Sequence, residues 1–222
     1  MIKRLFGSLF KASASSAQAR GVQTFHDIYE LLFCDRPELF QPKDESSAVA
    51  WQRTLYCSPR AEAIRAMAED VAQESRVRLL GYRWLASHDL AVTSKEILGV
   101  VVEVGLEQGN DTLAAYADGS SRYINQSGKL AVFEGGPPEV AACASELIQV
   151  SRDTVDSIGP WDKPRRSPPD RGDIRLTFLV ADGLYFGEGP FNLLANEPLA
   201  KPVINTAVRL LQLCVAAASA EP

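Results

Sequence analysis

The chain has 222 residues, of which 46% are hydrophobic and 23% are charged. This composition excludes a chain that is disordered along its whole length, and the length suits one large domain or two small ones. A membrane-spanning helix needs roughly 20 apolar residues. The most apolar stretch, residues 203–218, is interrupted by Asn205, Thr206, Arg209 and Gln212, so we expect no segment that crosses a bilayer.

Charge is distributed unevenly along the chain. The formal net charge of −5 divides into +4 in residues 1–26, which contain no acidic residue, and −9 in residues 27–222. An acidic body repels the phosphate groups of DNA and RNA. The charge therefore disfavours nucleic acid as a partner.

The first eleven residues are predicted to form a basic amphipathic helix, because their large apolar side chains recur at the spacing of one helical face. The candidates for membrane or partner contact are Ile2, Leu5, Phe6, Leu9 and Phe10 on that face, with Lys3, Arg4 and Lys11 off it. Residues 12–20 are rich in Ser, Ala and Gln and are predicted to be a linker. Residues 1–21 therefore form a segment separate from a single domain over residues 22–222.

Four roles fit this N-terminal segment: attachment to an anionic membrane surface, docking into a partner's groove, folding back onto its own domain, or mitochondrial targeting. Each large apolar side chain that it buries would contribute roughly 1.5–3 kcal/mol. Each basic residue near anionic lipid would add about 1 kcal/mol. Reversible membrane attachment is therefore energetically feasible.

The cysteines indicate a reducing compartment. Cys34, Cys57, Cys143 and Cys214 form no CxxC pair, and no histidine is spaced to complete a zinc site with them. We expect free thiols and a cytoplasmic location. The location becomes peripheral to a membrane if residues 1–11 bind lipid, or the mitochondrial matrix if they are a transit peptide.

The first part of the domain, about residues 22–95, is predicted to be mainly helical. Apolar residues repeat with helical period over residues 25–33, and residues 37–47 are predicted to be a polar loop. A second helix is predicted over residues 58–71, because a serine cap precedes a proline in its first turn. A third is predicted over residues 77–87, although its apolar spacing also fits a strand.

The sheet is predicted in the second part of the domain, about residues 96–222. The valine-rich stretch 97–106 is too β-branched for a natural helix. Asp118-Gly119 suits a tight turn between two further short strands, and a fourth strand is predicted over residues 130–133. Strands joined by turns this short pair antiparallel, as a meander.

Two helices and a second hairpin complete the predicted fold. One long helix is predicted over residues 140–158, and Asp182-Gly183 is predicted to turn the second hairpin, followed by a loop over residues 187–190. The last helix, about residues 198–218, is apolar on most of its circumference and is expected to be central. The predicted class is α+β: an antiparallel sheet, made of a meander and a second hairpin, packed with two long helices of the C-terminal half and preceded by a helical N-terminal region.

No metal or cofactor is expected from the histidines. His26 and His88 each precede an aspartate, a pairing found in some metal-dependent phosphohydrolases, but that scaffold is wholly helical and this chain has strands. A metal site of this type needs three or more ligands, and no other residue is spaced to join. We therefore interpret both histidines as structural or solvated.

Carboxylates are the remaining candidates for catalysis, because no nucleophile motif is present. The acids at predicted strand ends or turns are Glu103, Asp118, Glu134, Asp182 and Glu188. Acidic residues are common in turns for conformational reasons alone. Their presence is therefore a weak indication of an enzyme.

We expect a non-enzymatic module that binds a protein or a small ligand or acts as a scaffold. The alternatives are a small enzyme that uses carboxylates at hairpin turns, such as Asp118 and Asp182, and a peripheral membrane-associated adaptor. An exposed sheet edge would support a homodimer, but the sequence does not identify the edge strand.

The membrane hypothesis predicts that residues 1–21 carry binding to anionic lipid. We expect the full chain to co-sediment with anionic liposomes at low salt and to be released at high salt, because salt screens the attraction of the basic residues. A chain that lacks residues 1–21 is the control and should stay in the supernatant. If neither chain pellets, the segment acts in targeting or docking instead.

Overall fold

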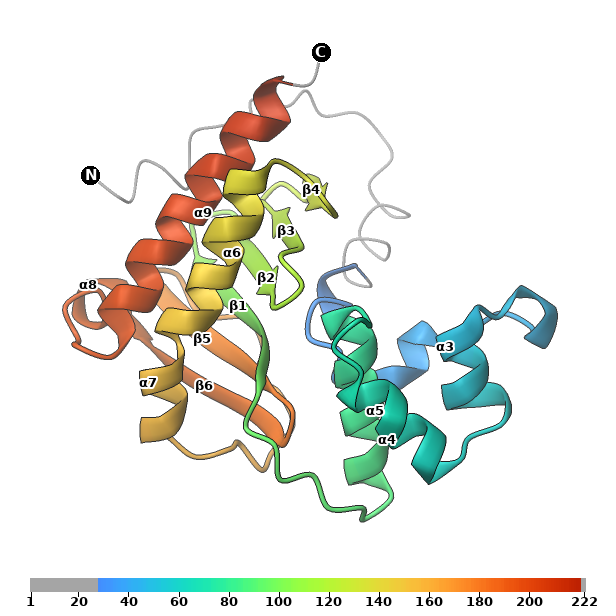
Figure 1. The fold of residues 1–222 in the computed structure, drawn as a ribbon. Helices are drawn as coiled ribbons and strands as arrows, with labels where there is room; N and C mark the ends of the chain where they lie inside the picture. Colours follow the sequence, from blue (N-terminus) through green and yellow to red (C-terminus); the bar gives the residue numbers. More distant parts are fainter. Residues whose placement is uncertain (1–27, 221–222) are drawn as a thin grey trace.

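A six-stranded antiparallel sheet runs through the centre of residues 28–220, the part of the chain that this computed structural model describes (Figure 1). The strand order is β4-β3-β2-β1-β5-β6. The strands are β1 (Ile97–Gly105), β2 (Asn110–Tyr116), β3 (Ser121–Ile124), β4 (Leu130–Phe133), β5 (Asp173–Val180) and β6 (Gly183–Pro190). The first four form the predicted meander, and β5 returns beside β1 to begin the second hairpin.

Helical segments precede the sheet, separate its two parts and follow it. Those before the sheet are η1 (Pro37–Phe40), η2 (Glu45–Ser47), α3 (Ala50–Gln52), η3 (Arg53–Cys57), α4 (Ala61–Glu69) and α5 (Ser75–Ser87). Those after β4 are α6 (Pro138–Val150), α7 (Arg152–Ser157), α8 (Phe191–Leu194) and α9 (Ala200–Ala220). The predicted α+β class is confirmed, including the helix assigned over residues 77–87.

The two faces of the sheet carry different helical layers. The helices α6 and α9 lie side by side over one face (Figure 1), where Val100 and Val102 of β1 join their core. Residues 29–34 and α5 share a second core with Leu98 and Val101 on the opposite face. Every residue of β1 is buried, because the strand lies between both layers. Burial on both faces explains its nearly continuous apolar sequence.

The helix predicted over residues 140–158 is divided in two at Ser151. The Ser151 hydroxyl donates a hydrogen bond to the carbonyl oxygen of Leu147 over 2.7 Å. A serine that bonds the carbonyl four residues back bends a helix. The apolar spacing continues across this break, so the sequence pattern does not reveal it.

Other details also differ from the sequence prediction. β6 pairs with β5 as far as Pro190, so residues 187–190 belong to a strand and not to a loop. The predicted loop over residues 37–47 contains the helical turns η1 and η2. Val71 is 82% exposed, because α4 ends at Glu69. α9 is not central: its buried side chains form one stripe against the sheet, and the rest of its surface faces outward.

A charged cluster lies at the centre of the sheet. Glu103 of β1 is fully buried and accepts a hydrogen bond from the Tyr29 hydroxyl over 2.6 Å. The Arg175 guanidinium of β5 lies 3.6 Å from the other Glu103 oxygen and 2.5 Å from Glu188 of β6. Burial raises the pKa of the Glu103 carboxyl, while the Tyr29 hydrogen bond and the charge of Arg175 favour its ionised form.

Arg175 also attaches a proline-rich loop, residues 161–172, to the sheet. Its guanidinium donates to the carbonyl oxygens of Arg166 and Ser167 in that loop. Removing one partner of a buried ion pair leaves the other charge uncompensated in a medium of low polarity. The stability of the sheet and the position of the loop therefore depend on the same side chain.

Arg175→Met is expected to lower the free energy of unfolding by roughly 3–5 kcal/mol, because it leaves Glu103 buried without its cation. The matched control is Arg171→Met, which removes an exposed ion pair with Glu107 and should cost less than about 1 kcal/mol. Urea denaturation measures both changes. Equal losses in the two variants would contradict the importance of the buried pair.

Candidate functional site

The two edges of the sheet are protected to different degrees. At the β6 edge, the backbone N–H of Trp161 donates to the Leu184 carbonyl oxygen over 2.6 Å. The Trp161 ring packs edge-on against Phe186. β6 also ends in Pro190, which has no N–H to offer. Among residues 28–220, no strand or bridge lies on the outer side of β4. Of the two edges, β4 is the one open to a further strand.

The hydrogen-bond pattern of the β3–β4 hairpin shows which groups of β4 point outward. The Asn125 N–H donates to the Lys129 carbonyl oxygen over 3.0 Å, which makes these residues a hydrogen-bonded pair. Hydrogen-bonded and non-bonded pairs alternate in an antiparallel ladder. Leu130 opposite Ile124 and Val132 opposite Arg122 are therefore non-bonded pairs. The backbone N–H and C=O groups of Leu130 and Val132 point away from β3.

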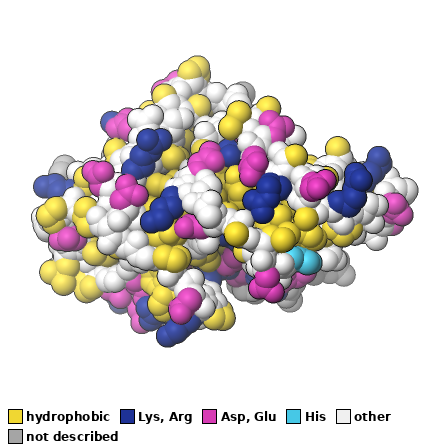
Figure 2. All heavy atoms as spheres, turned by 60° about the horizontal axis from the view of Figure 1, so that its bottom comes forward, with side chains coloured by type: hydrophobic (Ala, Val, Ile, Leu, Met, Phe, Trp, Pro, Cys, Tyr) yellow, Lys and Arg dark blue, Asp and Glu magenta, His cyan; other side chains and the backbone are white. Residues whose placement is uncertain are grey.

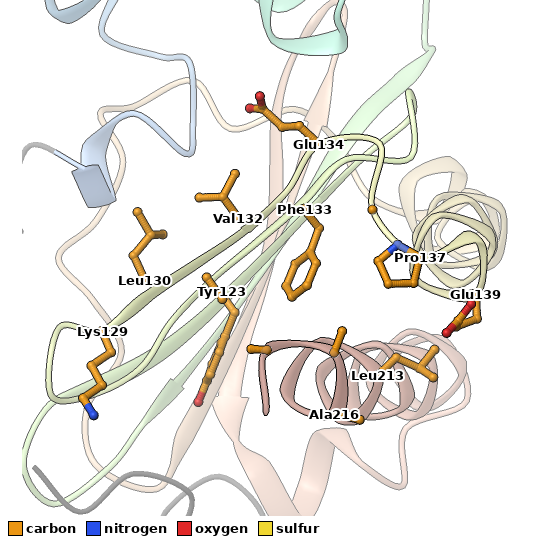
Figure 3. Close-up of a pocket in the computed structure, with 14 residues that line it drawn as sticks. Tyr123, Lys129, Leu130, Val132, Phe133, Glu134, Pro137, Glu139, Leu213 and Ala216 are labelled. Carbon is orange, nitrogen blue, oxygen red and sulfur yellow. The ribbon is translucent and has the colours of Figure 1, made fainter. Parts of the chain in front are cut away.

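A groove with both apolar and polar lining residues lies beside this edge, between the β3–β4 hairpin and the C-terminal half of α9. The cavity has a volume of about 1050 Å³. Tyr123 and Phe133 point from the hairpin toward Leu213 and Ala216 of α9 (Figure 3). Lys129 and Glu139 lie at opposite ends of the groove (Figure 3).

Within residues 28–220, the other side of β4 is only partly covered. Leu130 and Val132 point away from α9 (Figure 3) and are 42% and 47% exposed. The described helical layer on that face packs on β1, β2, β5 and Ile124 of β3, and its core includes no residue of β4. An extended segment added at this edge would therefore find apolar contacts on both sides: Leu130 and Val132 on one, and the groove on the other.

A buried aspartate positions the groove tyrosine. The Tyr123 hydroxyl donates to Asp111 of β2 over 2.9 Å, and the backbone N–H of Gln126 donates to the same carboxylate over 2.7 Å. Burial raises the pKa of Asp111 to about 6, although both hydrogen bonds favour its ionised form. Asp111 thus links β2 to the β3–β4 turn and fixes one wall of the groove.

The predicted catalytic pair, Asp118 and Asp182, is used in local hydrogen bonds. Asp118 accepts from the backbone N–H of Ser75 over 2.8 Å, so it caps the start of α5, and also from the Ser120 hydroxyl. Asp182 accepts from the Tyr185 hydroxyl over 3.0 Å. Asp118 lines a cavity of about 250 Å³, and Asp182 is not among the residues that line it.

The other candidate carboxylates are paired with arginines. Glu134 pairs with Arg122, and Glu103 and Glu188 share Arg175. Glu103 lies on β1, Glu188 on β6 and Glu134 directly after β4, so no two of them are on neighbouring strands. Each contributes to an ion pair that holds strands or loops together. The pairing of Glu103 and Glu188 with Arg175 is typical of structural neutralisation of buried charge, whereas the Glu134 side chain is exposed.

A second cavity, of about 700 Å³, lies where the proline-rich loop meets residues 29–36. Arg165 occupies its wall and is bound by Glu30 at 2.5 Å and Asp35 at 2.8 Å. Its guanidinium also lies 3.8 Å from the ring centre of Phe33. Because two carboxylates already bind this arginine, its main effect is to hold the N-terminal helical layer against the loop.

The described histidine and the cysteines do not form a reactive centre. Within residues 28–220, no group of three or more His, Cys, Asp and Glu side chains could hold a metal ion. His88 stacks on Trp84, whereas His26 lies outside the described residues. All four cysteines are free, as predicted, and burial raises the pKa of Cys34 to about 11 and that of Cys214 to about 12.

The contact residues predicted in the N-terminal segment also lie outside the described part of the chain. These are Ile2, Lys3, Arg4, Leu5, Phe6, Leu9, Phe10 and Lys11. Their roles stay predictions.

On the face shown in Figure 2, basic and acidic side chains are interspersed and apolar side chains lie between them.

One helix of the described chain, α9, is long and apolar enough to cross a membrane by length and composition. Core helices of soluble proteins meet the same criteria, and the buried stripe of α9 packs on the sheet. The apolar surface that α9 leaves outside this stripe includes its contribution to the groove.

Sequence reasoning found the strand over residues 130–133 but assigned it no role. One available signal was its place in the meander: the last strand before a long connection has a neighbour on one side only, unless a later strand returns to it. Here β5 returns to β1 instead. That choice depends on the tertiary fold.

Comparisons with known proteins do not assign a function to this site. The chain matches no model of a known protein family, and a search of curated proteins also finds no match. Function is therefore inferred from the residues and geometry of this chain.

Asp111→Asn should change how stability depends on pH. Because burial raises the pKa of Asp111 from 3.8 to about 6, the folded state binds this proton more tightly than the unfolded state does. Its stabilisation is complete below about pH 4 and is lost as the pH rises to about 6. Relative to Asp111→Asn, the wild-type chain should lose roughly 2 kcal/mol of unfolding free energy over this range.

Urea denaturation at a series of pH values measures this difference. Asp162→Asn, at an exposed position of the proline-rich loop, is the control and should follow the wild-type pH profile. A difference between wild type and Asp111→Asn that stays constant from pH 4 to 7 would contradict a raised pKa at Asp111.

Proposed function

We propose that this protein is a non-enzymatic protein-binding module whose binding surface is the β4 edge together with the groove beside it. A partner would add an extended segment as a seventh strand next to β4. The observation that carries the proposal is the presence of outward backbone groups on Leu130 and Val132 directly beside a groove of about 1050 Å³ that is lined in part by apolar side chains.

The surface supplies the two components of strand addition. Backbone hydrogen bonds to Leu130 and Val132 give affinity that does not depend on the partner's side chains. Successive side chains of an added strand point to opposite faces. Every second one would enter the groove beside Tyr123 and Phe133, and this spacing would select the sequence of the partner.

The charged groups elsewhere support a binding role over a catalytic one. Asp118 caps α5, Asp182 is bonded to Tyr185, and the buried acids are neutralised by arginines. An enzyme that used Asp118 and Asp182 together would need both in one cavity with a substrate. The membrane-adaptor alternative depends on residues 1–11 and is addressed by the liposome experiment.

A photo-crosslinking amino acid placed at Val132 of the full chain tests this surface in the cells that make the protein. We expect one discrete crosslinked product from position 132. Adding Leu130→Pro should remove that product, because proline deletes an outward N–H and leaves the bonds to β3 intact.

The matched control carries the crosslinker at Leu193, which is 63% exposed on α8 and lies outside the groove lining. It should not give the same product. The proposal would be contradicted by the same product from both positions, or by a product at position 132 that survives Leu130→Pro in a chain with unchanged circular dichroism.

A further inference from the structure

The cavity of about 700 Å³ that Arg165 lines, named the loop cavity below, has no lining residue in common with the β4 groove. Its walls come from separate parts of the chain: residues between 29 and 36, the β1–β2 turn, Gln126 of the β3–β4 turn and residues 164–168 of the proline-rich loop. Binding sites for small molecules have volumes of roughly 300–1,000 Å³. The loop cavity is therefore large enough for a small ligand.

The charge of the loop cavity differs from that of the chain as a whole. Its lining includes the acids Glu30 and Asp35 and the bases Arg36, Arg165 and Arg166, which gives a net charge of +1. The acidic body of the chain carries −9. Both lining acids are bound by Arg165, at 2.5 and 2.8 Å. The cavity is therefore a local site of positive charge, with Arg36 and Arg166 as the arginines available to an anion.

Arg36 can turn to a ligand without destabilising the fold. Its side chain is 45% exposed and contacts two acids, Glu38 at 2.9 Å and Glu30 at 3.7 Å. Glu38 is itself 55% exposed, and a pair between exposed side chains contributes little to stability. Glu30 keeps its closer contact with Arg165. An anion that bound Arg36 would therefore leave no buried acid without a cation.

Arg166 is available for a similar reason. Its side chain is 56% exposed and lies 3.3 Å from Glu188. Glu188 is mostly buried, but Arg175 binds it more closely, at 2.5 Å. If Arg166 turned to a ligand, Glu188 would still have the cation that compensates its charge.

Amide groups add uncharged donors to the loop cavity. Gln108 and Gln126 line it, and within residues 28–220 no hydrogen bond occupies either side-chain amide. The Asn110 side chain donates to the Pro169 carbonyl oxygen over 3.0 Å, so the start of β2 is tied to the loop. Guanidinium groups bind carboxylate and phosphate oxygens through paired hydrogen bonds, and an amide N–H can bind the same oxygens. The lining thus combines donors that recognise an oxyanion.

We propose that the loop cavity binds a small molecule through its carboxylate or phosphate groups, which Arg36 and Arg166 contact from two different walls. Arg165 is a positioning residue here: it neutralises Glu30 and Asp35, so these acids repel the ligand less. The site goes beyond the proposed β4 surface and shares no lining residue with it. Its failure would therefore leave the proposed function intact.

Isothermal titration calorimetry of the full chain at constant ionic strength tests the site, with pyrophosphate and citrate as probes. We expect at least one probe to bind with a dissociation constant below about 1 mM. Arg36→Gln and Arg166→Gln should each raise that constant roughly fivefold or more, because each removes charge-assisted hydrogen bonds. Tighter binding of pyrophosphate would assign a phosphate ligand, and tighter binding of citrate a carboxylate ligand.

Arg171→Gln is the matched control, because Arg171 is a 70% exposed arginine of the same loop that lies outside the loop cavity. It removes the same charge and should change the dissociation constant by less than about twofold. Arg166→Lys keeps the charge without the forked donors and should bind more weakly than wild type but more tightly than Arg166→Gln. Circular dichroism checks that each variant keeps the fold.

Two results would overturn the proposal. The first is that neither probe binds at about 10 mM, a concentration at which a ligand with a dissociation constant of about 1 mM is nearly saturating. The second is that Arg36→Gln and Arg166→Gln weaken binding no more than Arg171→Gln does, because the probes would then respond to net charge and not to this cavity.

Discussion

The structure depends on one buried ion pair in the central strand. Glu103 lies in β1 with no exposed surface, where burial raises the pKa of its carboxyl, and Arg175 and the Tyr29 hydroxyl beside it favour the ionised form. Through these contacts, β1 holds β5, β6, the first described helical residues and the proline-rich loop in one place. Since a lone charge would be costly at this position, the four segments are positioned together or not at all.

This constraint also determines which surface stays open. The polar cluster fixes residues 29–36 and the loop over the β1, β5 and β6 side of the sheet. Among residues 28–220, the core of the helical layer therefore includes residues of β1, β2 and β3 but none of β4, and Leu130 and Val132 are 42% and 47% exposed. On the opposite face, a groove separates α9 from the β3–β4 hairpin. A binding edge thus results from the way the core is neutralised and packed.

The distribution of charge separates structural from functional roles. Most of the acids that sequence reasoning selected are bound to arginines or cap helices, so their negative charge is already compensated. The groove has charged groups mainly at its ends, where they can select the direction of an added strand without the cost of burial. Its interior relies on Tyr123, which Asp111 holds in position from β2.

The sequence alone determined the local elements and the fold class. β-branched residues specified β1, glycine turns specified the meander and the second hairpin, and helical spacing specified α5, because these depend on neighbours along the chain. The break at Ser151, the full length of β6 and the position of α9 depend on contacts between distant residues. The same holds for the site: residues 130–133 read as an ordinary strand, and only the return of β5 to β1 makes β4 an edge. Likewise, Glu103 reads as an acid at a strand end, and only the tertiary fold brings Arg175 and Tyr29 to it, because hydrogen bonds and ion pairs between strands follow from sheet order and not from spacing in the sequence.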